Sequence, residues 1–158
     1  MKYERKTAMT NIEIEKMTLD DIDAVEEIDN LSFPIPWSRA SFEQELTNLF
    51  ATYWVAKIGK KVVGYIGSWM VIDECHIMNV AIHPKYRNLG IASKLIQAML
   101  NNCNQHGISY VLLEVRMQNI PAQKLYEKFG FHTDGIRKNY YKNPDGTYED
   151  AILMTKEF

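Results

Sequence analysis

The first third of the sequence changes from an alternating pattern to a helical one. Ile12 and Ile14 stand between charged residues, which predicts a strand with one buried face. Over residues 19–31 apolar residues recur at every third position, which predicts an amphipathic helix. Thr18 and Asp21 have the spacing of a capping box and predict where this helix begins.

Two prolines, Pro34 and Pro36, must interrupt this helix, because proline removes a backbone donor and restricts the residue before it. Ser38 has the side chain of an N-cap and predicts the start of a second helix. Three apolar residues are expected on the buried side of that helix: Phe42, Leu46 and Leu49.

The middle of the chain returns to strand-like patterns. Residues 52–58 and 62–72 are joined by Gly59-Lys60-Lys61, which fits a hairpin turn, and a third strand is predicted over residues 74–82. A long helix closed by Gly107 follows. Five apolar residues are expected on its buried side: Ile91, Leu95, Ile96, Met99 and Leu100.

The last third alternates between the two patterns. Residues 110–115 predict a buried strand, residues 121–129 a helix that Gly130 ends, and two further strands flank the loop at residues 143–146. The order is therefore strand, two helices, three strands, helix, strand, helix and two strands. Because hairpins come first and crossovers later, the sequence predicts an α/β fold with a mixed sheet and helices packed on its faces.

Composition and charge narrow the class of protein. A chain of 158 residues, 46% of them hydrophobic, predicts one globular domain over residues 11–158, preceded by a flexible extension at residues 1–10. The net charge of −2 lacks the basic excess of nucleic-acid-binding domains. The sequence has neither the apolar core of a signal peptide nor an apolar run long enough for a membrane span. We therefore expect a cytoplasmic protein that binds neither nucleic acid nor membranes, and a monomer is compatible with these patterns.

Two cysteines, Cys75 and Cys103, are too few for a disulfide framework. His76 adjoins Cys75, but neighbours along a strand point to opposite faces, so we expect no nucleophilic Cys–His pair. Cys103 and His106 have the spacing to share a helix face, yet no second pair completes a zinc site. Both cysteines are expected to be structural, and no metal is expected.

A candidate anion site lies where the third central strand leads into the long helix. The segment from Val80 to Ala92 brings two small residues, Gly90 and Ala92, to the helix start. Unpaired N–H groups and the helix dipole suit a phosphate there, and small side chains let it approach the backbone. Arg87 or Lys85 could add positive charge. The alternative is an ordinary tight turn with a packing glycine.

Glu114 interrupts the apolar strand at residues 111–115. A buried carboxylate is costly, and desolvation raises its pKa. Both properties suit a general base that acts through water. The alternative is a structural ion pair with Arg116, which is expected on the same face of the strand.

These motifs together resemble those of the GNAT acetyltransferase superfamily. Its acetyl-CoA signature is similar to Arg87-x-x-Gly90-x-Ala92, with Ala92 where glycine is commoner. Further matches follow in the same order: Leu113-Glu114-Val115-Arg116, Asn119, and Leu125-Tyr126-Glu127-x-Phe129-Gly130-Phe131. Two more segments resemble the RimI-type branch, the ribosomal-protein alanine N-acetyltransferases: Phe33-Pro34-x-Pro36-Trp37, and Arg137-x-x-Tyr140-Tyr141 with the later Asp145-Gly146 and Glu149-Asp150-Ala151. The resemblance extends from about Ile12 to Met154.

The resemblance implies a GNAT fold and an acetyl-CoA site. The fold is a twisted, mostly antiparallel sheet of about seven strands with four helices, in which the fourth and fifth strands splay to leave a slot for the pantetheine arm. Backbone groups of the fourth strand would bind that arm, and the helix start would hold the pyrophosphate. The implied cofactor-binding residues are Val80, Ala81, Ile82, Arg87, Asn88, Leu89, Gly90, Ile91, Ala92, Ser93 and Asn119. For Asn119 the alternative is a helix N-cap before Pro121.

The resemblance also implies the catalytic residues. Glu114 would act as the general base, and Tyr126 would lie beside the CoA sulfur and protonate it as it leaves. For Tyr126 the alternative is packing in the core. The amine would attack the thioester directly, and a backbone N–H between Val80 and Ile82 would steady the developing oxyanion.

The acceptor is expected to be a protein N-terminus. At pH 7, deprotonating an α-amine costs about 1 kcal/mol, against about 4.6 kcal/mol for a lysine side chain. In N-terminal acetyltransferases the segments that match Phe33, Pro34, Ile35, Tyr140 and Tyr141 flank the acceptor's first residue; ordinary aromatic cover of a sheet end is the alternative. We therefore expect acetylation of the N-terminal alanine of a small-subunit ribosomal protein.

The sequence is compatible with three alternative functions. Acetylation of a lysine side chain or a small-molecule amine would use the same acetyl-CoA site. A non-catalytic acetyl-CoA sensor would need neither Glu114 nor Tyr126. A dinucleotide-binding Rossmann domain is disfavoured because Gly90 lacks the G-x-G-x-x-G spacing.

Overall fold

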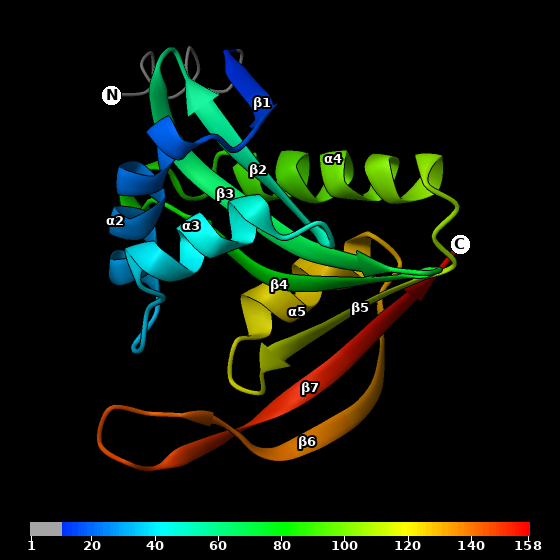
Figure 1. Ribbon diagram of the computed structural model, residues 1–158. Coiled ribbons are helices and arrows are strands. Elements are labelled where there is room, and N and C mark those ends of the chain that lie inside the picture. The colour runs from blue at the N-terminus through cyan, green and yellow to red at the C-terminus, as the bar shows by residue number, and fades with distance from the viewer. Residues whose placement is uncertain (1–10) are drawn as a thin grey trace.

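Seven strands form one twisted sheet in a computed structural model that describes residues 11–158 (Figure 1). The extension predicted at residues 1–10 lies outside the described residues. The strands are β1 (Ile12–Lys16), β2 (Ala51–Ile58), β3 (Lys61–Val71), β4 (Glu74–Ile82), β5 (Tyr110–Arg116), β6 (His132–Lys142) and β7 (Tyr148–Glu157). Their order in the sheet is β1-β2-β3-β4-β5-β7-β6, and every neighbouring pair is antiparallel except β4–β5. The predicted mixed, mostly antiparallel sheet is confirmed.

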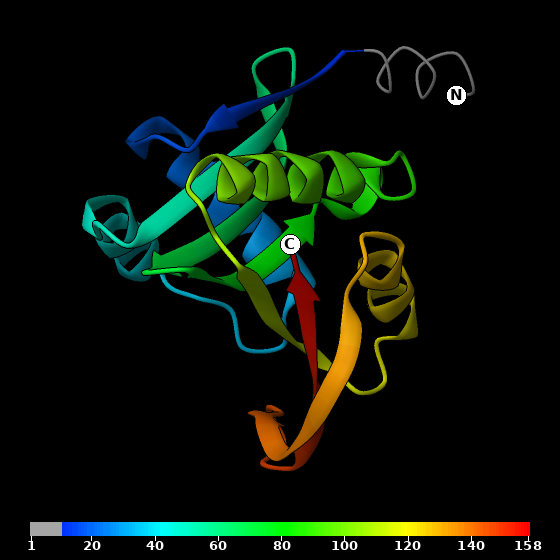
Figure 2. The same cartoon turned by 90° about the vertical axis from the view of Figure 1, so that its right-hand side faces the viewer.

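Helices cover both faces of this sheet. They are α2 (Ile22–Ser32), α3 (Arg39–Thr47), α4 (Ile91–Gln105) and α5 (Ile120–Lys128), with short 3-10 turns η1 (Leu19–Asp21) and η2 (Pro84–Tyr86). In Figure 2, α3 and α5 lie on opposite sides of the sheet. The predicted order of strands and helices is confirmed, with the two 3-10 turns as additions. Among residues 11–158, no helix is long and apolar enough to cross a membrane.

Each face of the sheet has its own apolar core. The larger core lies under α4 and α5 and contains all five of the α4 residues predicted to be buried. The smaller core lies under α2 and α3 and is built around Ile22, Phe42 and Tyr65, which are fully buried. The two cores fix the sheet between its helical layers, so that its exposed edges and ends are left for ligands.

Three leucines depart from their predicted places. α3 ends at Thr47, and Leu49 lies beyond it with its side chain 98% exposed. The cause is Asn48, whose side-chain oxygen accepts a hydrogen bond of 3.0 Å from the Phe50 nitrogen and turns the chain out of the helix. Leu19 and Leu31, at the two ends of the predicted helix, are also exposed. The capping box at its start is confirmed.

A single extra residue makes β4 and β5 part. Ser68 of β3 pairs with Ile77 and the adjacent Gly67 pairs with Asn79, so Met78 has no partner and forms a β-bulge. The parallel pairing of β4 with β5 ends at the same point, at Ile77 and Leu113. Beyond it the two strands diverge toward the left of Figure 1. The predicted splay of the fourth and fifth strands is therefore confirmed, and the bulge is its structural cause.

Candidate active site

The start of α4 has the geometry of an anion site. Gly90 is the N-cap and has a φ of +78°, a left-handed conformation that favours glycine. The first N–H groups of a helix have no partner within it, and Gly90 has no side chain to cap them. A Cβ built on Gly90 would meet no atom within 4 Å, so the space above this backbone is open. These N–H groups are free to bind a phosphate.

Some of the other residues predicted to bind the cofactor at this loop can offer only their backbone, and others can offer a side chain. Leu89 and Ile91 are 6% and 1% exposed and belong to the core, so only their backbone can face a ligand. Arg87 is exposed, and its Nε donates a hydrogen bond of 3.1 Å to the carbonyl oxygen of Ile82. Its Nη2 lies 3.4 Å from the Ser32 hydroxyl. Arg87 therefore links the end of β4 to the end of α2.

The end of β4 offers a free strand edge. Residues 78–82 have no pairing partner on β5, while Val80, Ala81 and Ile82 remain paired with β3 on their other side. Ala81 is buried under α2, so it contributes backbone groups rather than a side chain. An extended ligand could therefore pair with this edge as an added strand.

Asn119 is the N-cap of α5. Its Oδ1 accepts a hydrogen bond of 3.3 Å from the nitrogen of Ala122, which confirms the capping alternative. The residue is exposed, and its amide group has no hydrogen bond to any described residue. A second role for that amide in ligand binding is compatible with the cap.

Glu114 is held by two basic residues, one from β4 on one side of β5 and one from β6 on the other side, beyond β7. Its side chain is 8% exposed; Oε2 lies 2.5 Å from Nε2 of His76 on β4, and Oε1 lies 3.8 Å from Nη2 of Arg137 on β6. The predicted alternative, an ion pair with Arg116, is wrong. Arg116 instead contacts Glu149 at 3.0 Å, across the β5–β7 pair.

These contacts reverse the expected pKa shift of Glu114. Burial raises the pKa of this carboxyl, but the hydrogen bond to His76 and the charges of His76 and Arg137 together lower it by more. Its pKa therefore lies below the ordinary value of 4.5, and the sequence-based expectation of a raised value is wrong. Glu114 is consequently ionised at neutral pH and can accept a proton.

Tyr126 lies on α5 in the larger core and is 9% exposed. Its ring packs edge-on against Phe131, with the ring centroids 5.7 Å apart. Burial raises the pKa of its hydroxyl to about 12, so the group stays protonated at neutral pH. The hydroxyl makes no hydrogen bond to any described residue, and its charge when ionised would raise the pKa of Tyr141. Tyr126 therefore packs in the core.

Tyr140 lies in a bulge of β6, and Tyr141 is the first paired residue after it. Arg137 pairs with Ala151 and Tyr141 with Glu149, so the three residues 138–140 oppose Asp150 alone. The two tyrosine rings meet edge-to-face at 4.9 Å. Burial raises the pKa of both hydroxyls, and the negative charge of Glu114 raises both further. Arg137 links this pair to Glu114, because its guanidinium lies 5.7 Å from the centre of the Tyr140 ring and 3.8 Å from Oε1 of Glu114.

The loop at residues 33–37 forms another part of this face. Phe33 ends α2 in an extended conformation and packs against the smaller core, while Ile35 is 54% exposed. The nitrogen of Trp37 donates a hydrogen bond of 2.7 Å to the buried carboxylate of Asp29, which anchors the loop. Both views show the loop descending toward the β6–β7 hairpin (Figures 1 and 2).

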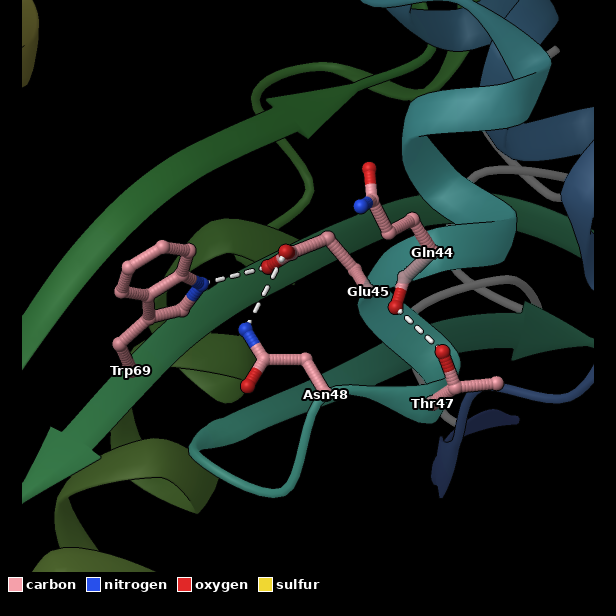
Figure 3. Close-up of a pocket in the computed structure, with 5 residues that line it drawn as sticks. All are labelled: Gln44, Glu45, Thr47, Asn48 and Trp69. Atoms are coloured by element: carbon pink, nitrogen blue, oxygen red, sulfur yellow. Dashed lines mark hydrogen bonds between the residues drawn. The ribbon is translucent and has the colours of Figure 1, made fainter.

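A pocket at the end of α3 contains none of the predicted site residues. It is lined by Gln44, Glu45, Thr47, Asn48 and Trp69 (Figure 3). Oε2 of the nearly buried Glu45 accepts a hydrogen bond of 2.5 Å from the Trp69 indole. Trp69 is the β3 partner of His76, so the pocket borders the site without containing its ionised groups.

Sequence reasoning missed two contacts of the site, His76 and Arg137. A usable signal existed for His76: once Cys75 is assigned to the core, its neighbour must point to the opposite face of the strand. The structure confirms this separation, because Cys75 and Cys103 are both fully buried while His76 contacts Glu114. Their burial agrees with the structural role expected of both cysteines.

Comparisons with known proteins agree with this geometry. The model of the acetyltransferase (GNAT) family matches residues 22–131. A Bacillus subtilis (strain 168) protein is 41% identical over 146 residues, which cover 92% of this chain and 95% of that protein. The ribosomal protein bS18-alanine N-acetyltransferase of Haemophilus ducreyi is 36% identical over 143 residues, covering 89% and 97%. The crystal structure of the ribosomal-protein-S18-alanine N-acetyltransferase from Escherichia coli superposes with a TM-score of 0.85 at 29% identity, covering 92% and 93%.

Proposed function

The chain belongs to the acetyltransferase (GNAT) family as an acetyl-CoA-dependent N-acetyltransferase, and we propose that it acetylates the N-terminal alanine of a small-subunit ribosomal protein. The observation that carries this proposal is the match to relatives named for that reaction, which extends over about nine-tenths of the chain. The reaction would take place in the cytoplasm, where ribosomal proteins are made, and residues 11–158 would suffice for it as one domain.

The donor site that we propose combines the start of α4 with the free edge of β4. Residues Asn88 to Ser93 would hold the pyrophosphate, because the N–H groups there are uncapped and Gly90 leaves the backbone open. The backbone of Val80 and Ile82 would pair with the pantetheine arm, and the free amide of Asn119 would add a polar contact. The chemistry supplied by bound acetyl-CoA is an activated acetyl group on a thiol.

Three groups of the chain would then serve the transfer. The ionised Glu114 accepts a proton from the attacking α-amine through a water molecule. A backbone N–H between Val80 and Ile82 donates a hydrogen bond to the carbonyl oxygen as charge develops there. The Tyr126 hydroxyl is protonated at neutral pH and would donate a hydrogen bond to the sulfur, passing its proton to the thiolate as the C–S bond breaks.

The acceptor would enter between the loop at residues 33–37 and the β6 bulge. Phe33, Pro34 and Ile35 would line one side, and Tyr140 and Tyr141 the other. The contacts of Arg137 with both Glu114 and the Tyr140 ring support this path, and Tyr141 packs against Tyr140. An α-amine also suits the base better than a lysine, since its deprotonation at pH 7 is easier by about 3.6 kcal/mol.

A peptide panel tests the proposal. Peptides beginning with Ala, Ser, Met or Gly, each with one internal Lys, are offered with free and with blocked N-termini, and the products are read by mass spectrometry. We expect acetylation of the free alanine terminus alone. Acetylation of the internal lysine would show that the acceptor is a lysine side chain instead. Binding of acetyl-CoA without turnover on any peptide would favour a non-catalytic sensor.

A further inference from the structure

His76 and Glu114 meet where β4 and β5 separate. His76 lies in the last paired part of β4, opposite Leu112, whereas Glu114 is the first residue of β5 beyond the end of the pairing at Leu113. The two side chains therefore close the narrow end of the gap between the strands. Their atoms Nε2 and Oε2 are 2.5 Å apart.

The two oxygens of Glu114 have different surroundings. Oε2 is occupied by the short contact with His76, while Oε1 lies 3.8 Å from Nη2 of Arg137, beyond the reach of a hydrogen bond. A carboxylate fixed through one oxygen keeps one orientation, and its other oxygen stays available to a substrate. Arg137 is 54% exposed at its side chain and is held less tightly than His76.

His76 is not needed to build the core. Its side chain is 37% exposed, and the adjacent Cys75 and Ile77 supply the packing of this part of β4. Its cross-strand neighbour Trp69 directs its indole N–H to Glu45 instead. Its contact with Glu114 is thus the one side-chain hydrogen bond that His76 makes to a described residue.

We propose that His76 is a positioning residue for the general base: its imidazole N–H holds Oε2 of Glu114 so that Oε1 faces the reacting amine. This inference rests on the proposed function. In the step concerned, an N–H bond of the amine breaks and its proton passes to the bridging water, while a proton of that water forms an O–H bond on Oε1. His76 neither gains nor loses a proton in this step.

The charged and titratable groups around Glu114 are few, which makes the effect of His76 measurable. His76 faces it from β4, Arg137, Tyr140 and Tyr141 face it from β6, and its partner on β7 is the apolar Leu153. Since His76 lowers the pKa of Glu114, removal of the imidazole should raise that pKa toward or above its ordinary value.

The test compares His76→Ala, His76→Gln and the control His132→Ala, which removes an exposed histidine of β6. We expect His76→Ala to lower kcat on the alanine peptide by about tenfold to a hundredfold, with the KM for acetyl-CoA unchanged. The fall of kcat at acidic pH that follows protonation of Glu114 should begin at a higher pH than in the unchanged protein. His76→Gln keeps a side-chain N–H at the same reach, so it should recover most of the activity, and His132→Ala should match the unchanged protein.

A second readout does not depend on turnover. The pKa of the Glu114 carboxyl is measured by carbon-13 NMR in the unchanged protein and in the two His76 variants. A rise of the Glu114 pKa in His76→Ala that His76→Gln reverses supports the inference even if the alanine peptide is not acetylated. A lack of acetylation of that peptide would instead contradict the proposed acceptor. An unchanged pKa in His76→Ala, or equal kcat in all variants of an active enzyme, would overturn it.

Discussion

The backbone nitrogen of Asn139 donates a hydrogen bond of 2.8 Å to Oδ1 of Asp150. Asn139 has a φ of +53°, a conformation that costs free energy for a residue with a side chain. Asp150 therefore holds together the β6 bulge that carries Tyr140, and it does so from the strand opposite. The acceptor side of the site depends on this contact although Asp150 is not expected to touch a substrate.

Asp150→Ala should consequently weaken acceptor binding. Without its partner the bulge loses its anchor, so the KM for the alanine peptide should rise about tenfold while the KM for acetyl-CoA stays the same. Steady-state kinetics with each substrate varied in turn measures the difference. Asp134→Ala, which removes a β6 carboxylate bonded to Thr155, is the matched control. An equal rise in both KM values would mean that the bulge does not serve the acceptor alone.

Glu114→Gln should remove the base and keep the shape of the site. We expect kcat to fall by about a hundredfold to ten-thousandfold, which is the usual contribution of a general base. Acetyl-CoA affinity, measured by calorimetry, should change little because the donor site lies on β4 and α4. Glu127→Gln on the exposed side of α5 is the control. Unchanged turnover would discard Glu114 as the base.

Tyr126→Phe should separate packing from proton donation. The phenylalanine ring keeps the contact with Phe131, so the melting temperature should stay within a few degrees. Loss of the hydroxyl should lower kcat by about a hundredfold, because the departing sulfur loses its proton donor. Stopped assays over a range of pH check this result. If Tyr126→Phe shows wild-type rates at every pH, Tyr126 serves only to pack the core and is not the proton donor.

The pH dependence of the reaction should follow the acceptor rather than the base. The pKa of Glu114 lies below 4.5, so it loses its charge only as the pH falls through that lower value and stays ionised near neutrality. The rise of kcat/KM between about pH 6 and 9 should therefore reflect the α-ammonium group, whose ordinary pKa is about 7.8. For two peptides whose α-amines differ in pKa, the rise of kcat/KM should occur at pH values that differ by the same amount. A rise at the same pH for both peptides would show that it reflects a group of the enzyme.

Tyr65→Phe should destabilise the fold. The fully buried Tyr65 hydroxyl donates a short hydrogen bond to the carboxylate of Asp29, which is also fully buried. Its removal should lower the free energy of unfolding by about 1–3 kcal/mol, measured by urea denaturation. Burial raises the pKa of Asp29 above 3.8, so the loss should shrink as falling pH protonates this carboxyl. Tyr148→Phe, at an exposed position, should have no such effect.

The sequence predicted correctly those features that are set by residues close together along the chain. The spacing of apolar residues identified the buried side of α4, and the loop before it identified Gly90, because helix periodicity and a left-handed turn are set by neighbouring residues. The same reasoning failed at Leu49, where one hydrogen bond from the Phe50 nitrogen to the side chain of Asn48 outweighed a continuing helical spacing.

Partners across the sheet could not be predicted in this way. Arg116 has the right position on β5 to reach Glu114, but it forms an ion pair with Glu149, on a strand that comes later in the chain. His76 is 38 residues before Glu114 and meets it only because β4 and β5 run in parallel with this register. The sign of the pKa shift of Glu114 depends on these partners, so it could not be predicted from the sequence either.

The extra residue in β4 bears on how such a chain can evolve. Cys75 and Ile77 before the bulge, and Val80 and Ile82 after it, pack against the same core. Loss of the codon for Met78 would leave each of these side chains on its present face while straightening the strand. The straightened β4 would meet β5 beyond Leu113 and extend the ladder of hydrogen bonds. A chain altered in this way would keep its core yet have no gap for a donor, so a single in-frame deletion would turn an acetyltransferase into an inert scaffold.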